Sequence, residues 1–255
     1  MFTKQKIKSD KMERYSDSTK LDMLLEKYPG LFECIVIDTE TTGIYHYDIV
    51  GGHQRKNYIL QLTIISAHTG GVLYDGYFKP KIKSWPEAEK VNHITYNMVK
   101  DCPTIKAESE KIQKILDAAR VVIGYNTFFD VGFLQFSGLN FFKTNHFIDV
   151  MEDYSVWNGD LHQYFHSFTW QKLTKAAKES GFDWAKLPPH NSAADCLATL
   201  HVAHWLQKQN KEKGWQIYFP PCMHYEGEYT CEECSMPCRI RGRTRLCLVS
   251  PFGDE

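Results

Sequence analysis

The chain contains 255 residues, of which 43% are hydrophobic and 24% are charged. This length can bury one sizeable core and carry a small extension, so we expect one main domain. No apolar run approaches the roughly 20 residues that span a bilayer, and the lysine-rich start lacks the apolar stretch of a secretion signal. We therefore expect a soluble protein of the cytoplasm or another intracellular compartment, without a membrane partner.

Charge alone does not point to a nucleic-acid partner. The formal net charge is −1, whereas nucleic-acid-binding proteins usually carry a basic surplus. Several acids gathered in one site would offset basic patches elsewhere in that total. Lysines are frequent within residues 1–20. We interpret residues 1–30 as a basic N-terminal extension with a short helix over Leu21–Tyr28, which could contact phosphates or a partner protein.

The first half of the chain predicts paired strands followed by a helix. Residues Cys34–Asp38 read as a buried strand that ends in an acid, at the border of a loop. Two further strands are predicted over Leu60–Ser66 and Val72–Phe78, and the glycine-rich turn between them favours an antiparallel hairpin. Apolar residues then recur at helical spacing behind Pro103.

Strands and helices alternate in the second half. Short strands are predicted over Val121–Gly124 and Phe147–Val150. A helix over Trp170–Ser180 is closed by a glycine, and a longer helix over Ser192–Gln209 follows a pair of prolines. This order predicts an α/β domain over residues 31–210, in which helices flank a mixed sheet. A short linker from Lys211 would lead into a cysteine-rich tail.

Four acids are predicted at the ends of elements. Asp38 and Glu40 stand two residues apart, so both can point to one face of a sheet. Asp130 follows a strand, and Asp195 opens the last helix, five residues after His190. Because such ends converge in an α/β sheet, the four carboxylates could form one oxygen-rich site for Mg²⁺ or Mn²⁺. Taken singly, each Asp could instead cap a helix or form a turn.

These residues resemble the three exonuclease motifs of the DnaQ-like superfamily, in its DEDDh branch, which includes proofreading subunits. The motifs correspond to Asp38-Thr-Glu-Thr-Thr-Gly43, Asn126-Thr-Phe-Phe-Asp130 and His190-Asn-Ser-Ala-Ala-Asp195. The resemblance extends from about Leu31 to Gln209. It implies a ribonuclease-H-like fold and metal-dependent 3′-to-5′ removal of nucleotides from nucleic-acid ends, with DNA and single-stranded 3′ ends as the favoured substrates.

The resemblance also implies residue roles. Two Mg²⁺ or Mn²⁺ ions would be bridged by Asp38, with Glu40 and Asp195 completing one ion's ligands and Asp130 serving the other. His190 would be the general base, because its ordinary pKa of about 6.5 suits proton transfer near neutral pH. The terminal nucleotide would meet Thr41, Thr42, Ile44 and Asn126.

Three positions depart from the family pattern. Tyr125 stands where many members have His, and His93 stands where the family has Gly before Ile-Thr. The stretch Ile44–Tyr58 between the first two predicted strands is longer than usual. None of these departures removes a catalytic group. They bear on substrate preference.

Five of the eight cysteines follow Pro221, in a tail too short for a large core of its own. In an intracellular protein, thiols in such a cluster are more often metal ligands than disulfides. We expect one structural zinc ion in residues 211–255. An iron–sulfur cluster or free thiols are the alternatives. The candidate ligands are Cys222, His224, Cys231, Cys234, Cys238 and Cys247.

Two other functions fit the sequence less well. An RNA-trimming exoribonuclease would use the same motifs, and the sequence does not separate it from a DNA-directed enzyme. A nucleic-acid-binding or assembly module would use the cysteine-rich tail and need no acids. The four acids and His190 disfavour the second alternative, since a module without catalysis has no need to retain them.

Overall fold

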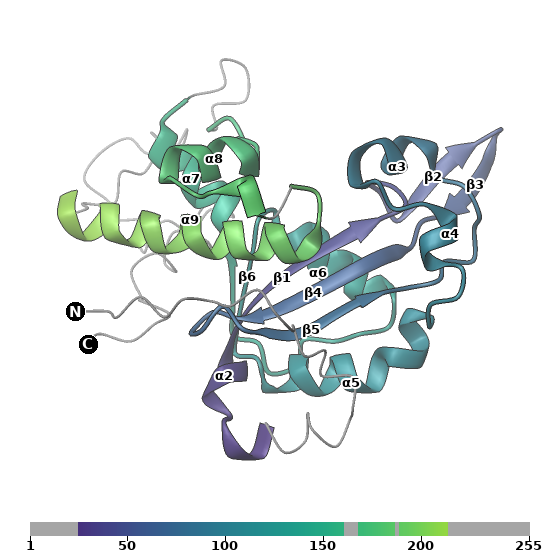
Figure 1. The fold of residues 1–255 in the computed structure, drawn as a ribbon, viewed down its shortest axis with the longest axis horizontal. Helices are drawn as coiled ribbons and strands as arrows, with labels where there is room; N and C mark the ends of the chain where they lie inside the picture. Colours follow the sequence, from purple (N-terminus) through teal and green to yellow (C-terminus); the bar gives the residue numbers. More distant parts are fainter. Residues whose placement is uncertain (1–24, 161–167, 187–188, 214–255) are drawn as a thin grey trace, which may run out of the picture.

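A computed structural model of the chain describes residues 25–160, 168–186 and 189–213 (Figure 1). Its main sheet has five strands in the order β5-β4-β1-β6-β7. Strand β4 is antiparallel to β1 and β5, whereas β6 is parallel to β1 and β7. The strands are β1 (Cys34–Thr41), β4 (Ile59–Ser66), β5 (Val72–Tyr77), β6 (Val121–Gly124) and β7 (His146–Asp149). The expected mixed sheet flanked by helices is confirmed.

Helices cover both faces of this sheet (Figure 1). One face packs on α2 (Gly30–Glu33), α5 (Ile105–Ala118) and α6 (Thr127–Phe136). The other face packs on α7 (Val150–Asn158), α8 (Leu173–Ser180) and α9 (Ser192–Lys213). Two short helices, α3 (Pro86–Asn92) and α4 (Tyr96–Val99), lie over the end of β4. A one-turn helix, η1 (Trp184–Lys186), precedes α9.

Strand β1 lies at the centre of the sheet and divides its side chains between the two cores. Ile35 and Ile37 belong to the core under α5 and α6, whereas Cys34 and Val36 belong to the core under α9. Successive side chains of a strand point to opposite faces, so this alternation fixes the direction of the later residues of β1 through Glu40. All four are buried, which explains the apolar run that marked this strand in the sequence.

Most of the predicted elements are present, with shifted ends. The predicted strand over Cys34–Asp38 continues to Thr41, so the expectation that Asp38 borders a loop was wrong. The reason is pairing, because Thr39, Glu40 and Thr41 all have partners on β4. The strand predicted over Phe147–Val150 ends at Asp149, since the Asp149 carboxylate accepts a hydrogen bond from the Met151 N–H and begins α7 at Val150.

Several elements were not predicted. The long stretch Ile44–Tyr58 contains a second, two-stranded sheet formed by β2 (Tyr47–Val50) and β3 (His53–Lys56). Helices α3, α4 and α7 were also missed, and α8 begins at Leu173, three residues later than expected.

The ends of the expected domain differ slightly from the structure. Residues 25–27 are helical, and the earlier part of the expected N-terminal helix lies outside the described residues. Helix α9 continues to Lys213, past the boundary expected after Asn210. The remainder of the cysteine-rich tail, with its candidate zinc ligands, lies outside the described residues. In the described part of the chain, no helix combines the length and the apolar character needed to cross a membrane.

Candidate active site

The two acids of the first motif lie on one face of β1. The alternation that points Cys34 and Val36 towards α9 also directs Asp38 and Glu40 to that face, because the register with β4 is regular through Glu40. Their partners on β4 are Thr63 and Gln61. The spacing of two residues therefore places both carboxylates under the start of α9, as the sequence predicted.

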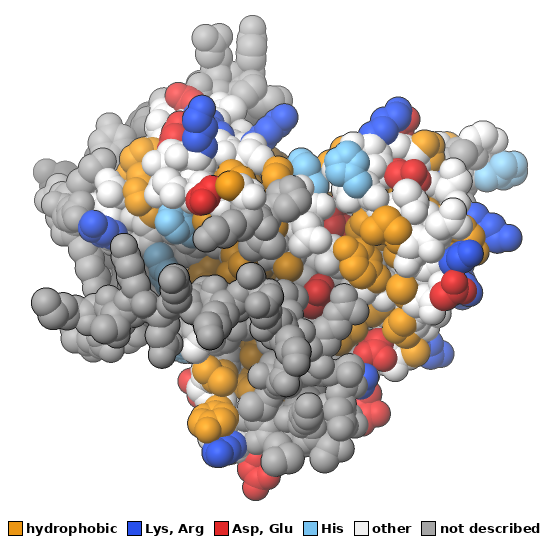
Figure 2. All heavy atoms as spheres, viewed as in Figure 1, with side chains coloured by type: hydrophobic (Ala, Val, Ile, Leu, Met, Phe, Trp, Pro, Cys, Tyr) orange, Lys and Arg blue, Asp and Glu red, His pale blue; other side chains and the backbone are white. Residues whose placement is uncertain are grey.

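Helix α9 supplies the third acid. Asp195 lies in its first turn and is buried. One carboxylate oxygen from each of Asp38, Glu40 and Asp195 lies within 4.8 Å of the other two. Acidic side chains are visible in a hollow between the α8 and α9 region and the α3 and α4 region, with histidine side chains at its rim (Figure 2). We call Asp38, Glu40 and Asp195 the carboxylate cluster.

Asp130 reaches the same region from the opposite face of the sheet. It lies in the first turn of α6, and its Oδ1 accepts hydrogen bonds from the Thr39 N–H at 2.8 Å and the Thr39 hydroxyl at 2.6 Å. Thr39 points to the α6 face because it alternates with Asp38 along β1. Asp130 therefore adjoins the carboxylate cluster, and its negative charge acts on Asp38 and Glu40.

Burial raises the pKa of all four acids, and neighbouring acids raise it further at Asp38 and Glu40. Burial and the charges of Asp130, Asp195 and Glu40 raise the pKa of Asp38 well above its ordinary value. Burial, followed by the charges of Asp195 and Asp130, raises the pKa of Glu40 to about 8. Burial likewise raises the pKa of Asp130 and of Asp195 to about 7. Raised pKa values of this kind are typical of functional sites, because burying several acids together costs stability.

The residues present fit a divalent cation. Asp195 Oδ1 is buried without a hydrogen-bond partner among the described protein atoms, while its Oδ2 accepts the His190 N–H at 3.3 Å. A buried carboxylate oxygen without a donor is costly unless a cation satisfies it. Every ligand atom in the cluster is a carboxylate oxygen, the donor type that hard cations such as Mg²⁺ and Mn²⁺ prefer.

His190 stands beside the cluster, as predicted. Its backbone is held in the left-handed region, at φ 63°, and its side chain is exposed. Partial burial and the nearby charges of His93 and Lys172 lower its pKa below 6.5. The imidazole is therefore mostly neutral near pH 7 and can accept a proton.

A hydrogen-bonded clamp, which the sequence did not reveal, fixes the start of α9. Ser192 Oγ lies 2.6 Å from Thr63 Oγ1, and the Ser192 N–H donates to Gln61 Oε1 at 3.5 Å. Asp75 on β5 accepts hydrogen bonds from Gln61 Nε2 and Thr63 Oγ1, each at 3.1 Å. Strands β4 and β5 thus set the position of the helix turn that carries Asp195.

Asn92 ties the end of β1 to α3. Its Nδ2 donates to the Thr41 carbonyl at 3.1 Å, and its Oδ1 accepts the Ile94 N–H at 3.1 Å. A hydrogen bond from the Asn92 side chain also lowers the pKa of Glu40 against the stronger effects that raise it. Asn92 therefore positions Glu40. The motif around Ile94 marked this segment in the sequence but gave no role for Asn92.

The start of α6 is held by Asp149 at the end of β7. Its carboxylate accepts the N–H groups of Asn126 at 2.9 Å and Thr127 at 3.2 Å. Asn126 caps the helix in the left-handed region, at φ 67°, and its side chain makes no capping hydrogen bond. The first turn of α6 carries Asp130, so Asp149 sets the position of that acid.

The residues expected to meet the terminal nucleotide differ in exposure. Thr41 and Thr42 are buried, and their hydroxyls donate to the Gly43 carbonyl at 2.7 Å and to Asn57 Oδ1 at 3.0 Å. Ile44 is 70% exposed. The threonine hydroxyls thus shape the turn after β1, and Ile44 is the side chain that this turn leaves exposed.

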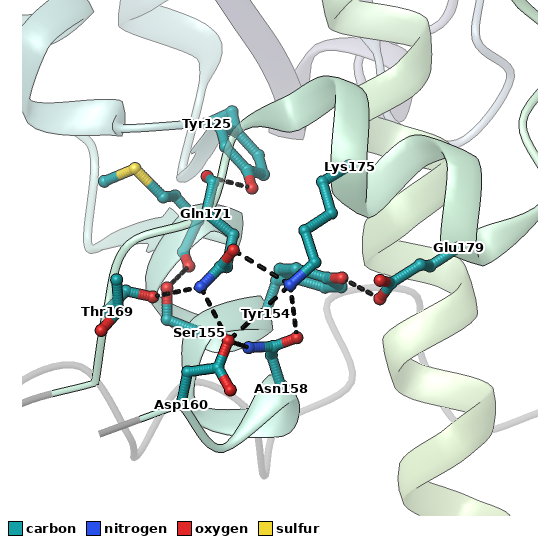
Figure 3. Close-up of polar contacts among 10 residues, drawn as sticks. Tyr125, Tyr154, Ser155, Asn158, Asp160, Thr169, Gln171, Lys175 and Glu179 are labelled. Carbon is teal, nitrogen blue, oxygen red and sulfur yellow. Dashed lines mark hydrogen bonds and ion pairs between the residues drawn. The ribbon is translucent and has the colours of Figure 1, made fainter. Parts of the chain in front are cut away.

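Tyr125, which departs from the family pattern, connects the second motif to α8. Its hydroxyl donates to the Gln171 carbonyl at 2.8 Å (Figure 3). The Gln171 side chain is held in turn by Lys175 and Asp160, and Lys175 also bonds Asn158. This network fixes Gln171, which precedes Lys172 in the chain. The charge of Lys172 is one of the effects that lower the pKa of His190.

Comparison with known proteins identifies the same region. A family model described as an exonuclease, RNase_T, matches residues 35–203. Over 105 residues the chain is 31% identical to DNA polymerase III subunit epsilon of Pasteurella multocida, and 32% identical to the subunit of the same name from Haemophilus influenzae. Each match covers 40% of this chain, and the chain spans about 40% of the length of these relatives.

Solved structures with a similar fold are also nucleases by name. A Saccharomyces cerevisiae Pan2 module of pseudoubiquitin hydrolase and RNA exonuclease, in complex with AAGGAA RNA, has a TM-score of 0.54 at 13% identity, covering 74% of this chain and 31% of that one. E. coli exonuclease I with a dA16 oligonucleotide has a TM-score of 0.51 at 16% identity, covering 68% and 40%. These likenesses establish the fold.

Proposed function

This chain belongs to the RNase_T exonuclease family, and from that premise we propose that it is a metal-dependent 3′-to-5′ exonuclease. It would hydrolyse the terminal phosphodiester bond of a nucleic-acid strand and release nucleoside monophosphates, with DNA as the favoured substrate. The observation that carries the proposal is the carboxylate cluster, whose three oxygens lie within 4.8 Å of one another. Asp130 and His190 stand beside it.

We propose that two Mg²⁺ or Mn²⁺ ions occupy this site. Asp38 would contact both ions, Glu40 and Asp195 would complete the ligands of one, and Asp130 would serve the other. The oxygen of Asp130 that Thr39 holds is already engaged by two donors, so its second oxygen is the one offered to a cation. Bound divalent ions would supply charge neutralisation for the phosphoryl oxygens and the departing 3′ oxygen.

The remaining chemistry falls to the chain's own groups. His190 would take a proton from the attacking water, because its lowered pKa leaves the ring able to accept one near neutral pH. Ile44 would pack against the terminal base, while the backbone at Thr41 and Thr42 and the side chain of Asn126 would hold the 3′ end. Such contacts read an end and not a base sequence, so a sequence-independent exonuclease follows.

An exoribonuclease is the nearest alternative, since the solved Pan2 module of similar fold is an RNA exonuclease by name. A digestion panel of single-stranded DNA, duplex DNA and RNA of one sequence separates the two. The proposal expects the highest rate of shortening for single-stranded DNA with Mg²⁺. Faster shortening of RNA would reassign the substrate. Binding to every strand without shortening would favour an assembly module.

The raised pKa values predict that the stability of the metal-free protein depends on pH. Protons bound by Glu40, near pH 8, and by Asp130 and Asp195, near pH 7, remove the cost of burying these charges. The folded state therefore binds more protons than the unfolded state, and metal-free stability should fall as the pH rises from about 4, the unfolded pKa of a carboxyl group, and level off above about 8. Mn²⁺ affinity should rise over the same range, since the cation competes with those protons.

Melting curves between about pH 6 and about pH 9, with and without saturating Mg²⁺, test this linkage. The metal-free protein should lose stability up to about pH 8 and then level off, and the loss should be much smaller with Mg²⁺. A metal-free stability that is flat or rises with pH would contradict the assigned pKa shifts.

From the cysteine-rich tail we predict about one bound zinc ion per chain. This zinc ion should resist the mild chelation that removes Mg²⁺, since thiolates hold zinc more tightly. Metal analysis of the full-length protein and of a truncation after Lys213, which keeps all of helix α9, gives the test. The truncated protein should lose the zinc and keep the carboxylate cluster. If the full-length protein holds neither zinc nor iron and its tail cysteines alkylate freely, the tail is no metal site.

A further inference from the structure

The hairpin formed by β2 and β3 carries an unusual set of exposed side chains. Tyr45 is 65% exposed, Tyr47 is 44% exposed and Ile49 is 74% exposed. Isolated exposed apolar residues need no explanation, but three at alternate positions along one segment indicate a surface made for contact. We call Tyr45, Tyr47 and Ile49 the stacking platform.

The hairpin is fastened to the strand end that carries the catalytic acids. The buried Asn57 donates from Nδ2 to the Tyr45 carbonyl at 2.9 Å and to Asp48 Oδ2 at 2.7 Å. Its Oδ1 accepts the Thr42 hydroxyl at 3.0 Å. A Cβ atom added to Gly43 would lie 2.4 Å from Asn57 Nδ2, so this close approach requires glycine. The platform is therefore held in a fixed relation to β1.

The base of the hairpin also packs on α6, the helix that carries Asp130. The His46 ring stacks on Phe136 with centroids 4.6 Å apart, and Tyr47 meets Phe136 edge-on at 5.1 Å. Lys56 Nζ lies 4.1 Å from the centre of the same ring. Two elements of the catalytic site thus support the hairpin, so side chains on it are preorganised relative to the reacting end of a strand.

The face that bears the platform is suited to nucleic acid. The strand register pairs Tyr47 with Lys56 and Ile49 with Gln54, so these four side chains share one face. The acid of the hairpin, Asp48, is neutralised by Arg55 at 3.2 Å. Basic and histidine side chains are visible at the end of the molecule formed by β2 and β3 (Figure 2). The face combines aromatic rings, an aliphatic side chain and a cation.

We propose that the stacking platform binds the nucleotides that precede the 3′-terminal one in the substrate strand. Bases would stack on Tyr45 and Tyr47, and Lys56 would lie close to the strand's phosphates. This inference rests on the proposed function, since it requires a strand whose 3′ end lies in the carboxylate cluster. A nucleic-acid occupant is favoured over a protein because the platform continues directly from the turn after β1 and shares its face with the cation Lys56. Base stacking on aromatic side chains is tolerant of sequence, which agrees with an enzyme that reads only an end.

The test compares two double variants on substrates of increasing length. One variant combines Tyr45→Ala with Tyr47→Ala, and the other combines Tyr45→Phe with Tyr47→Phe, which keeps both rings. The substrates are single-stranded oligothymidylates and the p-nitrophenyl ester of thymidine 5′-monophosphate, which is too short to reach the platform. Base stacking is worth about 1–3 kcal/mol per base, or roughly 5-fold to 150-fold in binding.

For the alanine variant we expect KM to rise about tenfold or more on the longer oligothymidylates, with little change on the nucleotide ester. The phenylalanine variant should match the wild type at every length. Phe142→Ala is the control, because Phe142 is 80% exposed and lies outside the hairpin, in the segment before β7. An alanine variant with the wild-type length dependence, or a phenylalanine variant as impaired as the alanine one, would overturn the inference. A wild-type protein that cleaves neither the ester nor the oligothymidylates would instead overturn the proposed function.

Discussion

Replacing Asp38 with Asn should reduce 3′-end hydrolysis by at least about 10³-fold, because a cation site contributes several kcal/mol and each 1.36 kcal/mol is about tenfold in rate. Asp38 is the acid on which the charges of Asp130, Asp195 and Glu40 all act, so no neighbour can replace it. A similar loss of hydrolysis rate is expected from the matching substitutions Glu40→Gln, Asp130→Asn and Asp195→Asn. Single-turnover hydrolysis of an end-labelled oligonucleotide measures each rate.

The same substitution should stabilise the metal-free fold. The pKa of Asp38 is raised by burial and by three neighbouring acids, so its ionised form opposes folding above the unfolded pKa of about 4. Removing that charge should raise the melting temperature near pH 8 by a few degrees, since about 1 kcal/mol shifts it by roughly 2–4 °C in a chain of this size. The difference should vanish near pH 4, where the wild-type carboxyl is itself protonated.

Asp101→Asn serves as the control, because Asp101 is exposed and lies in a turn. It should change neither the rate nor the melting temperature. A variant of Asp38 that keeps near-normal activity would remove the carboxylate cluster from catalysis. A variant that loses both activity and stability would show that Asp38 supports the fold.

The His190→Ala variant should lose about 10² to 10⁴ in rate, the usual contribution of a general base, while keeping its affinity for Mn²⁺. The lowered pKa of His190 places the acidic limb of the wild-type pH–rate profile below about pH 6.5. In the variant that limb should be absent, and the rate should recover in part as the pH rises, because hydroxide then replaces the missing base.

His146→Ala is the matched control, since His146 is an exposed histidine at the start of β7. In parallel strands the starts and the ends lie at opposite edges of a sheet, so this residue is remote from the cluster. An unchanged pH–rate profile in the His190→Ala variant would exclude the general-base role. Loss of Mn²⁺ binding would show that His190 positions Asp195, whose carboxylate its backbone contacts.

The alternation of β1 could be predicted from the sequence, but its length could not. Four apolar residues in a row indicated a central strand, and a spacing of two placed Asp38 and Glu40 on one face. The polar residues from Asp38 onward resembled a loop. They remain in the strand because β4 pairs with each of them through Thr41, and that register depends on contacts distant in the sequence.

The hairpin before β4 carried a signal that could have identified it. Gly51 and Gly52 both have positive φ, at 58° and 79°, and a Gly-Gly pair between strand-like residues is a recognised hairpin turn. Helix α3 likewise begins with Pro86, a residue suited to a first helical turn. Both signals were outweighed by the charged and polar residues around them.

The residues that position the acids could not be predicted from the sequence. The clamp of Gln61, Thr63, Asp75 and Ser192 joins two strands to one helix. Each residue taken alone is an ordinary polar side chain, and they meet only through the pairing of β4 with β5 and the packing of α9 on the sheet. Motifs locate the groups that react, whereas the three-dimensional register determines which groups hold them in place.

Whether the carboxylate cluster removes nucleotides from 3′ ends is decided by the position of a label. One single-stranded DNA carries a label at its 5′ end, and a second copy carries it at its 3′ end; both are incubated with Mg²⁺ or with a chelator. With Mg²⁺ we predict a ladder of shortening strands from the 5′-labelled copy and immediate release of a labelled mononucleotide from the 3′-labelled copy. Neither should appear with chelator or in the Asp38→Asn variant. Metal-independent cleavage, or a mononucleotide released first from the 5′-labelled copy, would contradict the account.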